Sequence, residues 1–305
     1  MKYAKPPLTF DQQADLLLGR GLIAERDKLI RCLGEVNYYR LSAYWYTFRI
    51  PEDPQDRLRP NTTFDIVWER YAFDRQLRIL TMDAVERVEI AMRTRLVNGF
   101  SLRHGPFGHT NRKNLSGMTR GTHNVFLRKI NEQAERSREP FVKHYQQKYH
   151  SEKHLPLWMA AELMTLNTVL TFYRHVETSL KQEIAAHYGV SDKVMESWLL
   201  SLNEVHNLCA HHARLWNRTL GNTPMIPRRR KHPQWHEPIQ TPASGIFPVL
   251  TVLRYMLDKI APQSQWPKRF HELLGRFPQI PLHLMGFPKD WDKHAIWGAD
   301  EKIKS

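Results

Sequence analysis

The sequence TTFDIVWERYAFDRQLRILTMDAVERVEIAMRTRL, residues 62–96, contains neither glycine nor proline and predicts one long helix. Thr62 and Thr63 are suitable N-cap residues for it. Along the stretch, residues recur at the three- and four-residue spacing of a helix that buries one face, namely Leu77, Leu80, Ala84, Val88, Ala91 and Arg95. We therefore expect a helix of about this length to organise the fold.

Helical patterns also cover most of the remaining chain. We expect further helices over residues 9–19, 24–33, 125–138, 140–149, 157–176, 178–188, 192–218, 246–260 and 264–275. The first begins with Thr9 and Gln12 at the spacing of a capping box, and the second is expected to end at Gly34. Because no internal repeat and no alternating strand pattern is visible, the sequence predicts an all-α fold.

Composition divides the chain into two regions. Residues 1–60 are expected to form an N-terminal helical and aromatic region, which is either a separate domain or a flap over the bundle. Residues 61–305 are expected to form the main helical domain. Two basic segments, 103–124 and 221–245, are predicted to be loops within it.

The formal net charge of +14 indicates a polyanionic partner. Nucleic acid fits better than a membrane, because no apolar run approaches the roughly 18–20 residues of a spanning helix. The first ten residues, MKYAKPPLTF, lack the apolar core of a signal peptide, and Cys32 and Cys209 form no CxxC pair. We expect a cytoplasmic protein without disulfides or contact with a membrane.

The stretch HNLCAHHARLWNR, residues 206–218, is the most informative for function. If it continues the preceding helix, one side spans about 80° of the helical wheel and carries Asn203, Asn207, His211, Arg214 and Arg218. The other side carries Leu202, Val205, Leu208, Cys209 and Trp216. We therefore expect His211 to face a substrate and His212 to pack. Imidazole, guanidinium and amide groups without a carboxylate suit a phosphate-bearing substrate better than a metal or an acyl group.

A metal site in the same stretch is disfavoured. Cys209, His211 and His212 are close in sequence, but neighbouring positions point to different faces of a helix. No His-x3-His pair with a carboxylate accompanies them. No metal and no other cofactor is expected.

Several separate motifs, in order along nearly the whole chain, resemble the Abi-like proteins of bacterial abortive infection, the AbiD/AbiF group. They are LTFDQQ (8–13), RGL (20–22), NYYRLSAY (37–44), FDR (73–75), ERVEI (86–90), GPFG (105–108), LPLW (155–158) and AHHARLWNR (210–218). The resemblance implies a HEPN-like helical bundle with an N-terminal helical extension. It also implies a toxin-like role in phage defence and metal-independent RNA cleavage at a site completed by a second copy. We therefore expect a homodimer that pairs the two 206–218 segments. A second pseudo-site within one chain and an assembly held by RNA are the alternatives. In the AbiF branch the resemblance further implies a structured non-coding RNA as partner.

The chain departs from this family's pattern at one position. Where the pattern resembles R-N-x-x-A-H, the chain has His206-Asn207-Leu208-Cys209-Ala210-His211. Arginine is always charged and grips phosphate through two nitrogens, whereas histidine is mostly neutral near pH 7. The replacement either weakens or abolishes cleavage, or it leaves two imidazoles acting as base and acid.

The resemblance and the residue chemistry together assign roles. His211 is the candidate general base or acid, Asn207 orients it or the phosphate, and His206 takes the place of the arginine. Arg214 and Arg218 are expected to neutralise phosphate charge. No metal is required, because the 2′-OH of RNA is itself the nucleophile.

Other residues are candidates for supporting roles. Glu86, Glu89 and Arg93 either line a groove beside His211 or form an ion-pair ladder, which is the interpretation we favour. The basic loops offer further phosphate contacts, namely Arg112, Lys113, Arg228, Arg229, Arg230 and Lys231. Arg40, within the aromatic run, is also a candidate for phosphate contact. The aromatic run around Arg40 is expected to be core rather than base-stacking surface, and it comprises Tyr38, Tyr39, Tyr44, Trp45 and Tyr46.

Taken together, the residues indicate a phosphate-bearing, polyanionic partner, and the resemblance implies an RNA-binding abortive-infection protein and a HEPN-type endoribonuclease. A non-catalytic RNA-binding scaffold with a degenerate site is the main alternative. A protein-interaction module is a third hypothesis, disfavoured by the net charge of +14.

Overall fold

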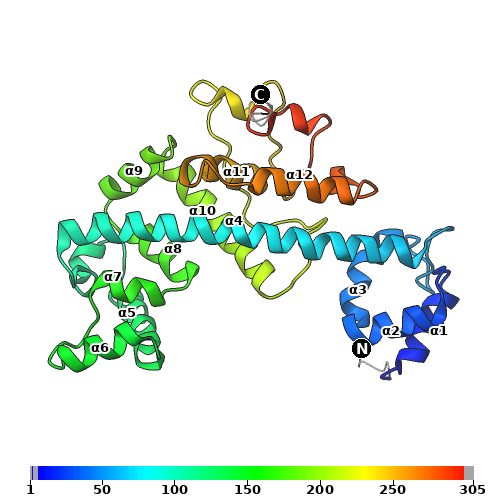
Figure 1. Cartoon of the computed structure of the whole chain (residues 1–305), viewed down its shortest axis with the longest axis horizontal. Helices are drawn as coiled ribbons and strands as arrows, with labels where there is room; N and C mark the ends of the chain where they lie inside the picture. The colour runs from blue at the N-terminus through cyan, green and yellow to red at the C-terminus, as the bar shows by residue number, and fades with distance from the viewer. Residues whose placement is uncertain (1, 3–5, 299–305) are drawn as a thin grey trace.

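Helix α4, Phe64–His104, is the longest element and runs across the whole molecule (Figure 1). Its 41 residues correspond to a length of about 60 Å. The Thr63 side chain accepts a hydrogen bond from the backbone N–H of Ile66, as expected for an N-cap. The helix ends later than the expected Leu96, because Val97 and Phe100 continue its buried face as far as Gly105.

The computed structural model describes residue 2 and residues 6–298. Within these residues the chain forms twelve α-helices, seven short 3₁₀-helices and two isolated β-bridges. The prediction of an all-α fold is therefore confirmed. No helix in this part of the chain is long and apolar enough to cross a membrane.

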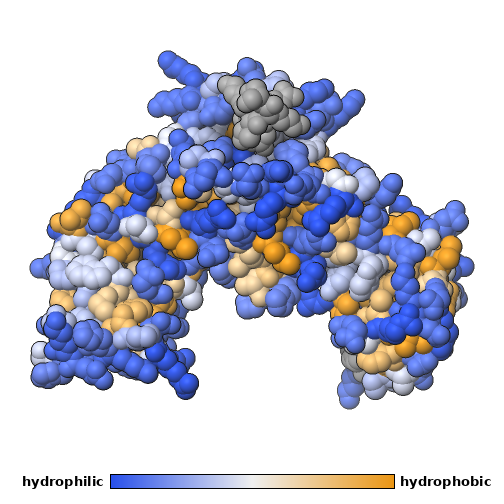
Figure 2. Space-filling model, in the orientation of Figure 1, coloured by the Kyte–Doolittle hydropathy of each residue, from blue (hydrophilic) through white to orange (hydrophobic). Residues whose placement is uncertain are grey.

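The helices form an arch with α4 as its beam (Figures 1 and 2). One leg consists of α1 (Phe10–Gly19), α2 (Arg26–Val36) and α3 (Tyr38–Trp45), followed by η1 (Tyr46–Phe48). The other leg consists of η2 (Gly108–Thr110), η3 (Arg112–Leu115), α5 (Arg120–Arg136), α6 (Pro140–Lys148), α7 (Leu157–Ala160), η4 (Ala161–Leu163) and α8 (Leu166–His175). The space between the legs is a broad concavity beneath α4 (Figure 2).

The remaining helices cross or cover the beam. They are α9 (Thr178–His187), α10 (Asp192–Ala210), η5 (Pro233–Trp235), α11 (Phe247–Ile260), α12 (Trp266–Arg276), η6 (Leu282–Met285) and η7 (Trp291–Lys293). Helix α10 crosses α4, and its C-terminal end emerges on the concave side of the arch, whereas α11 and α12 lie on the outer side (Figure 1). Trp266 fastens α12 to the beam, because its indole N–H donates to the backbone oxygen of Leu80 at 2.8 Å.

The first two helices agree with the prediction at the N-cap of α1 and differ from it at the end of α2. Thr9 and Gln12 form the predicted capping box of α1. The expected end of the second helix at Gly34 is wrong, because α2 continues to Val36. Gly34 lies within the helix, where a Cβ atom would lie 3.7 Å from the Phe10 ring, an ordinary van der Waals distance.

The segment 103–124 is more ordered than the expected loop. It contains the end of α4, two 3₁₀-helices and the start of α5. His109 and His123 are buried within it, and a His123 ring nitrogen lies 3.0 Å from the backbone oxygen of His109. Burial lowers the pKa of His109 to about 4, so this ring is neutral near pH 7 and adds no positive charge.

Candidate functional site

The 206–218 stretch is a helix end followed by a turn. Helix α10 ends at Ala210, so the helix expected over residues 192–218 is wrong beyond that residue. His211 is the C-cap, and His212 has a left-handed backbone with φ of 55°. Because the chain changes direction at His212, Arg214 and Arg218 do not continue the polar stripe that a longer helix would have given.

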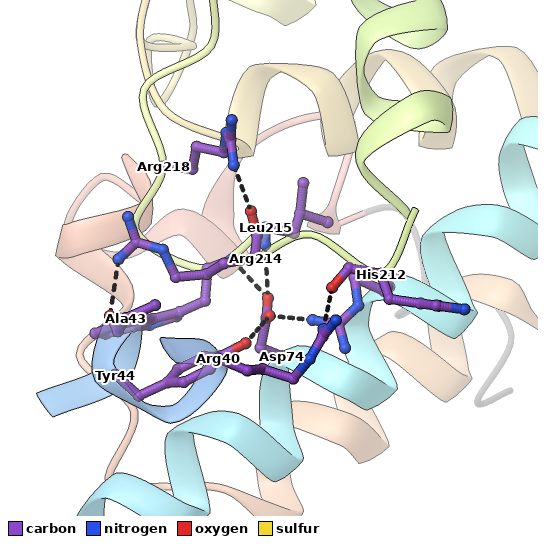
Figure 3. A network of polar contacts seen from close by, with 10 residues as sticks. Arg40, Ala43, Tyr44, Asp74, His212, Arg214, Leu215 and Arg218 are labelled. Carbon is purple, nitrogen blue, oxygen red and sulfur yellow. Dashed lines mark hydrogen bonds and ion pairs between the residues drawn. The ribbon is translucent and has the colours of Figure 1, made fainter. Parts of the chain in front are cut away.

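Asp74 of α4 holds the segment after this turn (Figure 3). Its carboxylate is fully buried and accepts hydrogen bonds from the backbone N–H groups of Leu215 at 3.1 Å and Trp216 at 2.6 Å. It also accepts from the Tyr44 hydroxyl at 2.6 Å and pairs with Arg78 one turn along α4. The Asp74 hub thus ties α3, α4 and the 211–218 segment together.

Two of the predicted phosphate-binding arginines bind the protein itself (Figure 3). Arg40 of α3 donates to the backbone oxygen of His212, and Arg214 donates to that of Ala43 at 3.1 Å. Burial lowers the pKa of the half-buried Arg214, although nearby Asp74 opposes the shift. Arg218 is exposed, and its guanidinium lies 3.5 Å from the backbone oxygen of Arg214.

This difference predicts distinct effects for Arg214→Ala and Arg218→Ala. Because Arg214 fastens the turn to α3, its removal is expected to lower the free energy of unfolding by about 1–2 kcal/mol. Arg218→Ala is expected to leave stability unchanged and to weaken the salt-dependent RNA binding that the sequence predicts. Urea unfolding and binding titrations at two salt concentrations test both expectations. Equal loss of stability in the two variants would contradict the distinction.

A second polar cluster joins α10 to the middle of α4. His206 Nδ1 lies 3.7 Å from a carboxylate oxygen of Glu89, whose other oxygen accepts a hydrogen bond from Arg93 at 2.5 Å. The predicted Glu89–Arg93 ion pair is therefore present, and Arg93 also donates to the backbone oxygen of Met164 at 3.1 Å. Glu86 is exposed on the same helix. The side chains of His206, Glu89 and Arg93 are 28%, 13% and 15% exposed.

Buried polar atoms near this cluster lack hydrogen-bond partners. Within the part of the chain that the structure describes, these atoms include His206 Nδ1, Asn203 Oδ1 and Arg93 Nε. Asn203 and His206 are three residues apart on α10 and so share one face of the helix. Buried polar groups are normally paired, so an unsatisfied group of this kind is typical of a site that completes its bonds with a ligand or water.

Exposed polar side chains follow His206 along the end of α10 and its cap. Asn207 and His211 are exposed and one turn apart along the chain. His212 is exposed as well, so the expectation that it packs is wrong, because the left-handed turn directs the chain away from the helical path. His206, Asn207 and His211 therefore all fall within the last turns of α10 and its cap.

The basic loop residues lie elsewhere. Arg228, Arg229, Arg230 and Lys231 are exposed, and Arg229 pairs with Glu237 through a 2.8 Å bond from its Nε. The segment that carries these four residues packs on α10 through a contact between Trp235 and Trp198. Trp198 lies 13 residues, or about 20 Å, before His211 along the chain. Arg112 and Lys113 are exposed in η3, in the leg containing α5. The structure does not gather these residues around the end of α10.

The aromatic run divides into two groups. Tyr44 and Trp45 are buried, in agreement with the prediction that the run is core. For Tyr39 and Tyr46 the prediction of core is wrong, because these residues are 75% and 64% exposed. Tyr38 is half-buried and packs edge-on against Trp45, with ring centroids 5.1 Å apart.

Sequence reasoning missed the role of Asp74 and Arg78. Both lie on the otherwise apolar face of α4, four residues apart and with opposite charges. A charged pair at that spacing among apolar positions is the signal that could have indicated a buried hub.

Sequence reasoning also missed the role of Glu204. It accepts hydrogen bonds from the backbone of Gly221 at 2.8 Å and of Asn222 at 2.7 Å. Burial alone would raise the pKa of this carboxyl group, but these bonds outweigh burial and lower it. Glu204 thereby holds the chain where it leaves the turn.

Residues 6–298 contain no group of three or more His, Cys, Asp or Glu side chains placed to hold a metal ion. Burial raises the pKa of the Cys209 thiol to about 12, so this thiol stays protonated and is a poor nucleophile. The groups that the site offers for chemistry are therefore imidazole, guanidinium, carboxylate and amide.

These features define an all-α, basic protein with a histidine-bearing helix end fastened to a central helix. A model of the family described as Abi-like protein matches residues 31–217. The chain therefore belongs to the Abi-like protein family. The match includes α3, the Asp74 hub, the Glu89–Arg93 pair and the end of α10. No curated protein and no solved structure matches the chain.

Proposed function

We propose that this protein is an RNA-binding abortive-infection protein of the AbiD/AbiF type that cleaves RNA without a metal, as a HEPN-type endoribonuclease. One observation carries the proposal. His206, Asn207 and His211 lie in the last turns of α10 and its cap, and His206 is 3.7 Å from Glu89. This end of α10 is on the concave side of the arch (Figure 1). Membership of the Abi-like family supports the defence role.

The chemistry of these groups suits cleavage by the 2′-OH of RNA. Such a reaction needs a base for the hydroxyl proton, an acid for the leaving 5′-oxygen, and stabilisation of the charged phosphorus centre. The exposed His211 imidazole is the first candidate for proton transfer, and the partly exposed His206 is the second. Asn207 donates an amide hydrogen bond to the phosphate or to His211, and Arg218 neutralises phosphate charge.

We extend the proposal to a homodimer in which the two 206–218 segments approach each other. The resemblance of the 206–218 segment to the family's pattern carries this extension, and light scattering of the purified protein measures its mass.

Cleavage of labelled structured and unstructured RNA in excess EDTA tests the catalytic proposal. Wild type is expected to cut and to leave 2′,3′-cyclic phosphate ends. His211→Ala is expected to lower the rate by about 10²–10⁴-fold, the usual contribution of a general acid or base. The matched control is His212→Asn, since His212 is also exposed and asparagine tolerates its left-handed backbone. Undiminished cleavage by His211→Ala, or cleavage only without EDTA, would contradict the proposal.

One observation favours a second candidate function, a non-catalytic RNA-binding scaffold. Two of the arginines expected to hold phosphate, Arg40 and Arg214, are engaged with backbone oxygens. His206 also stands where the family-like pattern has arginine. The scaffold predicts that wild type and His211→Ala bind RNA equally well and that neither cleaves it.

A further inference from the structure

A cavity of about 440 Å³ opens between the last third of α4 and the α7–η4 segment. Arg93, Asn98 and Ser101 line it from α4, and Trp158 and Glu162 line it from the opposite side. Its volume falls within the range of about 300–1,000 Å³ that is typical of small-ligand sites. The site proposed above does not use this cavity.

The cavity combines an aromatic wall with unsatisfied polar atoms. Trp158 is 49% exposed, although large aromatic residues are mostly buried. Ser101 Oγ and Arg93 Nε are buried and have no hydrogen-bond partner among the described residues. The Asn98 amide is exposed in the same lining and offers both a donor and an acceptor.

Arg93 connects this cavity to the α10 site. It lines the cavity, donates to Glu89 at 2.5 Å, and lies 4.0 Å from Glu162 across the opening. The same Glu89 carboxylate lies 3.7 Å from His206 Nδ1. Arg93 thus borders the cavity, and Glu89 lies between Arg93 and the His206 imidazole.

We propose that this cavity binds one unpaired nucleobase of the RNA, next to the phosphate held at the end of α10. Trp158 stacks on the face of the base, and Asn98 and Ser101 bind its polar edge. A nucleobase is planar, so it can stack on the indole, and its rim carries donors and acceptors for the unpartnered polar atoms. An aliphatic side chain offers neither. The inference rests on the proposed RNA-binding function and adds a single-stranded substrate to it.

Binding of two end-labelled oligomers tests the proposal, one an unstructured RNA 12-mer and the other its fully abasic ribose-phosphate counterpart. Trp158→Ala is expected to weaken binding of the base-bearing oligomer by about 5- to 150-fold, the range for loss of one base–aromatic stack. Binding of the abasic oligomer is expected to be unchanged. Trp158→Phe keeps a stacking surface and is expected to retain most of the affinity. Tyr149→Ala, which removes another half-exposed aromatic ring, is the matched control.

The outcomes separate this inference from the proposed function. Equal binding of the base-bearing oligomer by wild type and Trp158→Ala overturns the nucleobase pocket, even if His211→Ala abolishes cleavage. Loss of base-dependent binding in Trp158→Ala supports the pocket, even if no protein cleaves RNA. Failure of wild type to bind either oligomer overturns both proposals and leaves the cavity to another kind of ligand.

Discussion

Replacing Asp74 with alanine is expected to lower the free energy of unfolding by about 3–5 kcal/mol, as for other buried pairs that lose one partner. The substitution leaves the Arg78 guanidinium buried without its carboxylate. It also removes the acceptor for the Tyr44 hydroxyl and for the backbone N–H groups of Leu215 and Trp216. Each of these groups would have to find water or stay unpaired, because the Asp74 side chain is fully buried.

Urea unfolding followed by tryptophan fluorescence measures this loss. Asp65→Ala is the matched control, since it removes a carboxylate from the same helix. Asp65 pairs with Lys28 at 2.6 Å, but its side chain is 77% exposed. An exposed pair contributes about 0–1 kcal/mol, so the control is expected to unfold close to wild type. Similar losses in the two variants would show that Asp74 does not act as a buried hub.

The sequence predicted the long helix and most other helices well, because their signals are local. Thr63 caps α4 and Thr9 caps α1 through side-chain oxygens, as the residue types at these positions indicate. The buried face of α4 could be read from its three- and four-residue spacing. These features depend on residues within a few positions of one another, so one sequence is enough to reveal them.

The end of α10 could not be predicted in this way. Residues 211–218 contain neither glycine nor proline, and their pattern continues a helix. The helix ends at Ala210 instead, and the N–H groups of Leu215 and Trp216 bond to Asp74, more than 140 positions away in the chain. Tertiary hydrogen bonds thus override local propensity, and no spacing rule within the stretch reports them.

The candidate site was predictable in its residue types and not in its geometry. The spacing of His206, Asn207 and His211 indicated one region, and these residues do share the end of α10. The partner of His206 is Glu89, more than 100 positions earlier, and only the crossing of α10 over α4 brings the two together. Likewise, the +14 charge indicated a polyanion but not that Arg40 and Arg214 bind backbone oxygens.

His206→Ala is expected to lower the rate of RNA cleavage by about 10²–10⁴-fold, as for loss of a proton-transfer group. Glu89 already has a cationic partner in Arg93, at 2.5 Å, and therefore needs no second one for its charge. The His206 imidazole lies 3.7 Å from that carboxylate. Unlike a guanidinium, an imidazole can both donate and accept a proton. For this reason we expect His206→Arg to lose cleavage as well, although it restores the arginine of the family-like pattern.

Single-turnover cleavage and RNA affinity, measured on the same preparations, separate proton transfer from binding. Because the His206 side chain is 28% exposed at a helix surface, its replacement is expected to leave the fold and the RNA affinity near wild type. Glu89→Gln keeps the shape of the neighbouring side chain and removes its charge, which tests whether the carboxylate orients the imidazole. Full activity in His206→Arg would assign His206 a purely electrostatic role and leave proton transfer to His211 alone, because a guanidinium does not exchange protons near neutral pH.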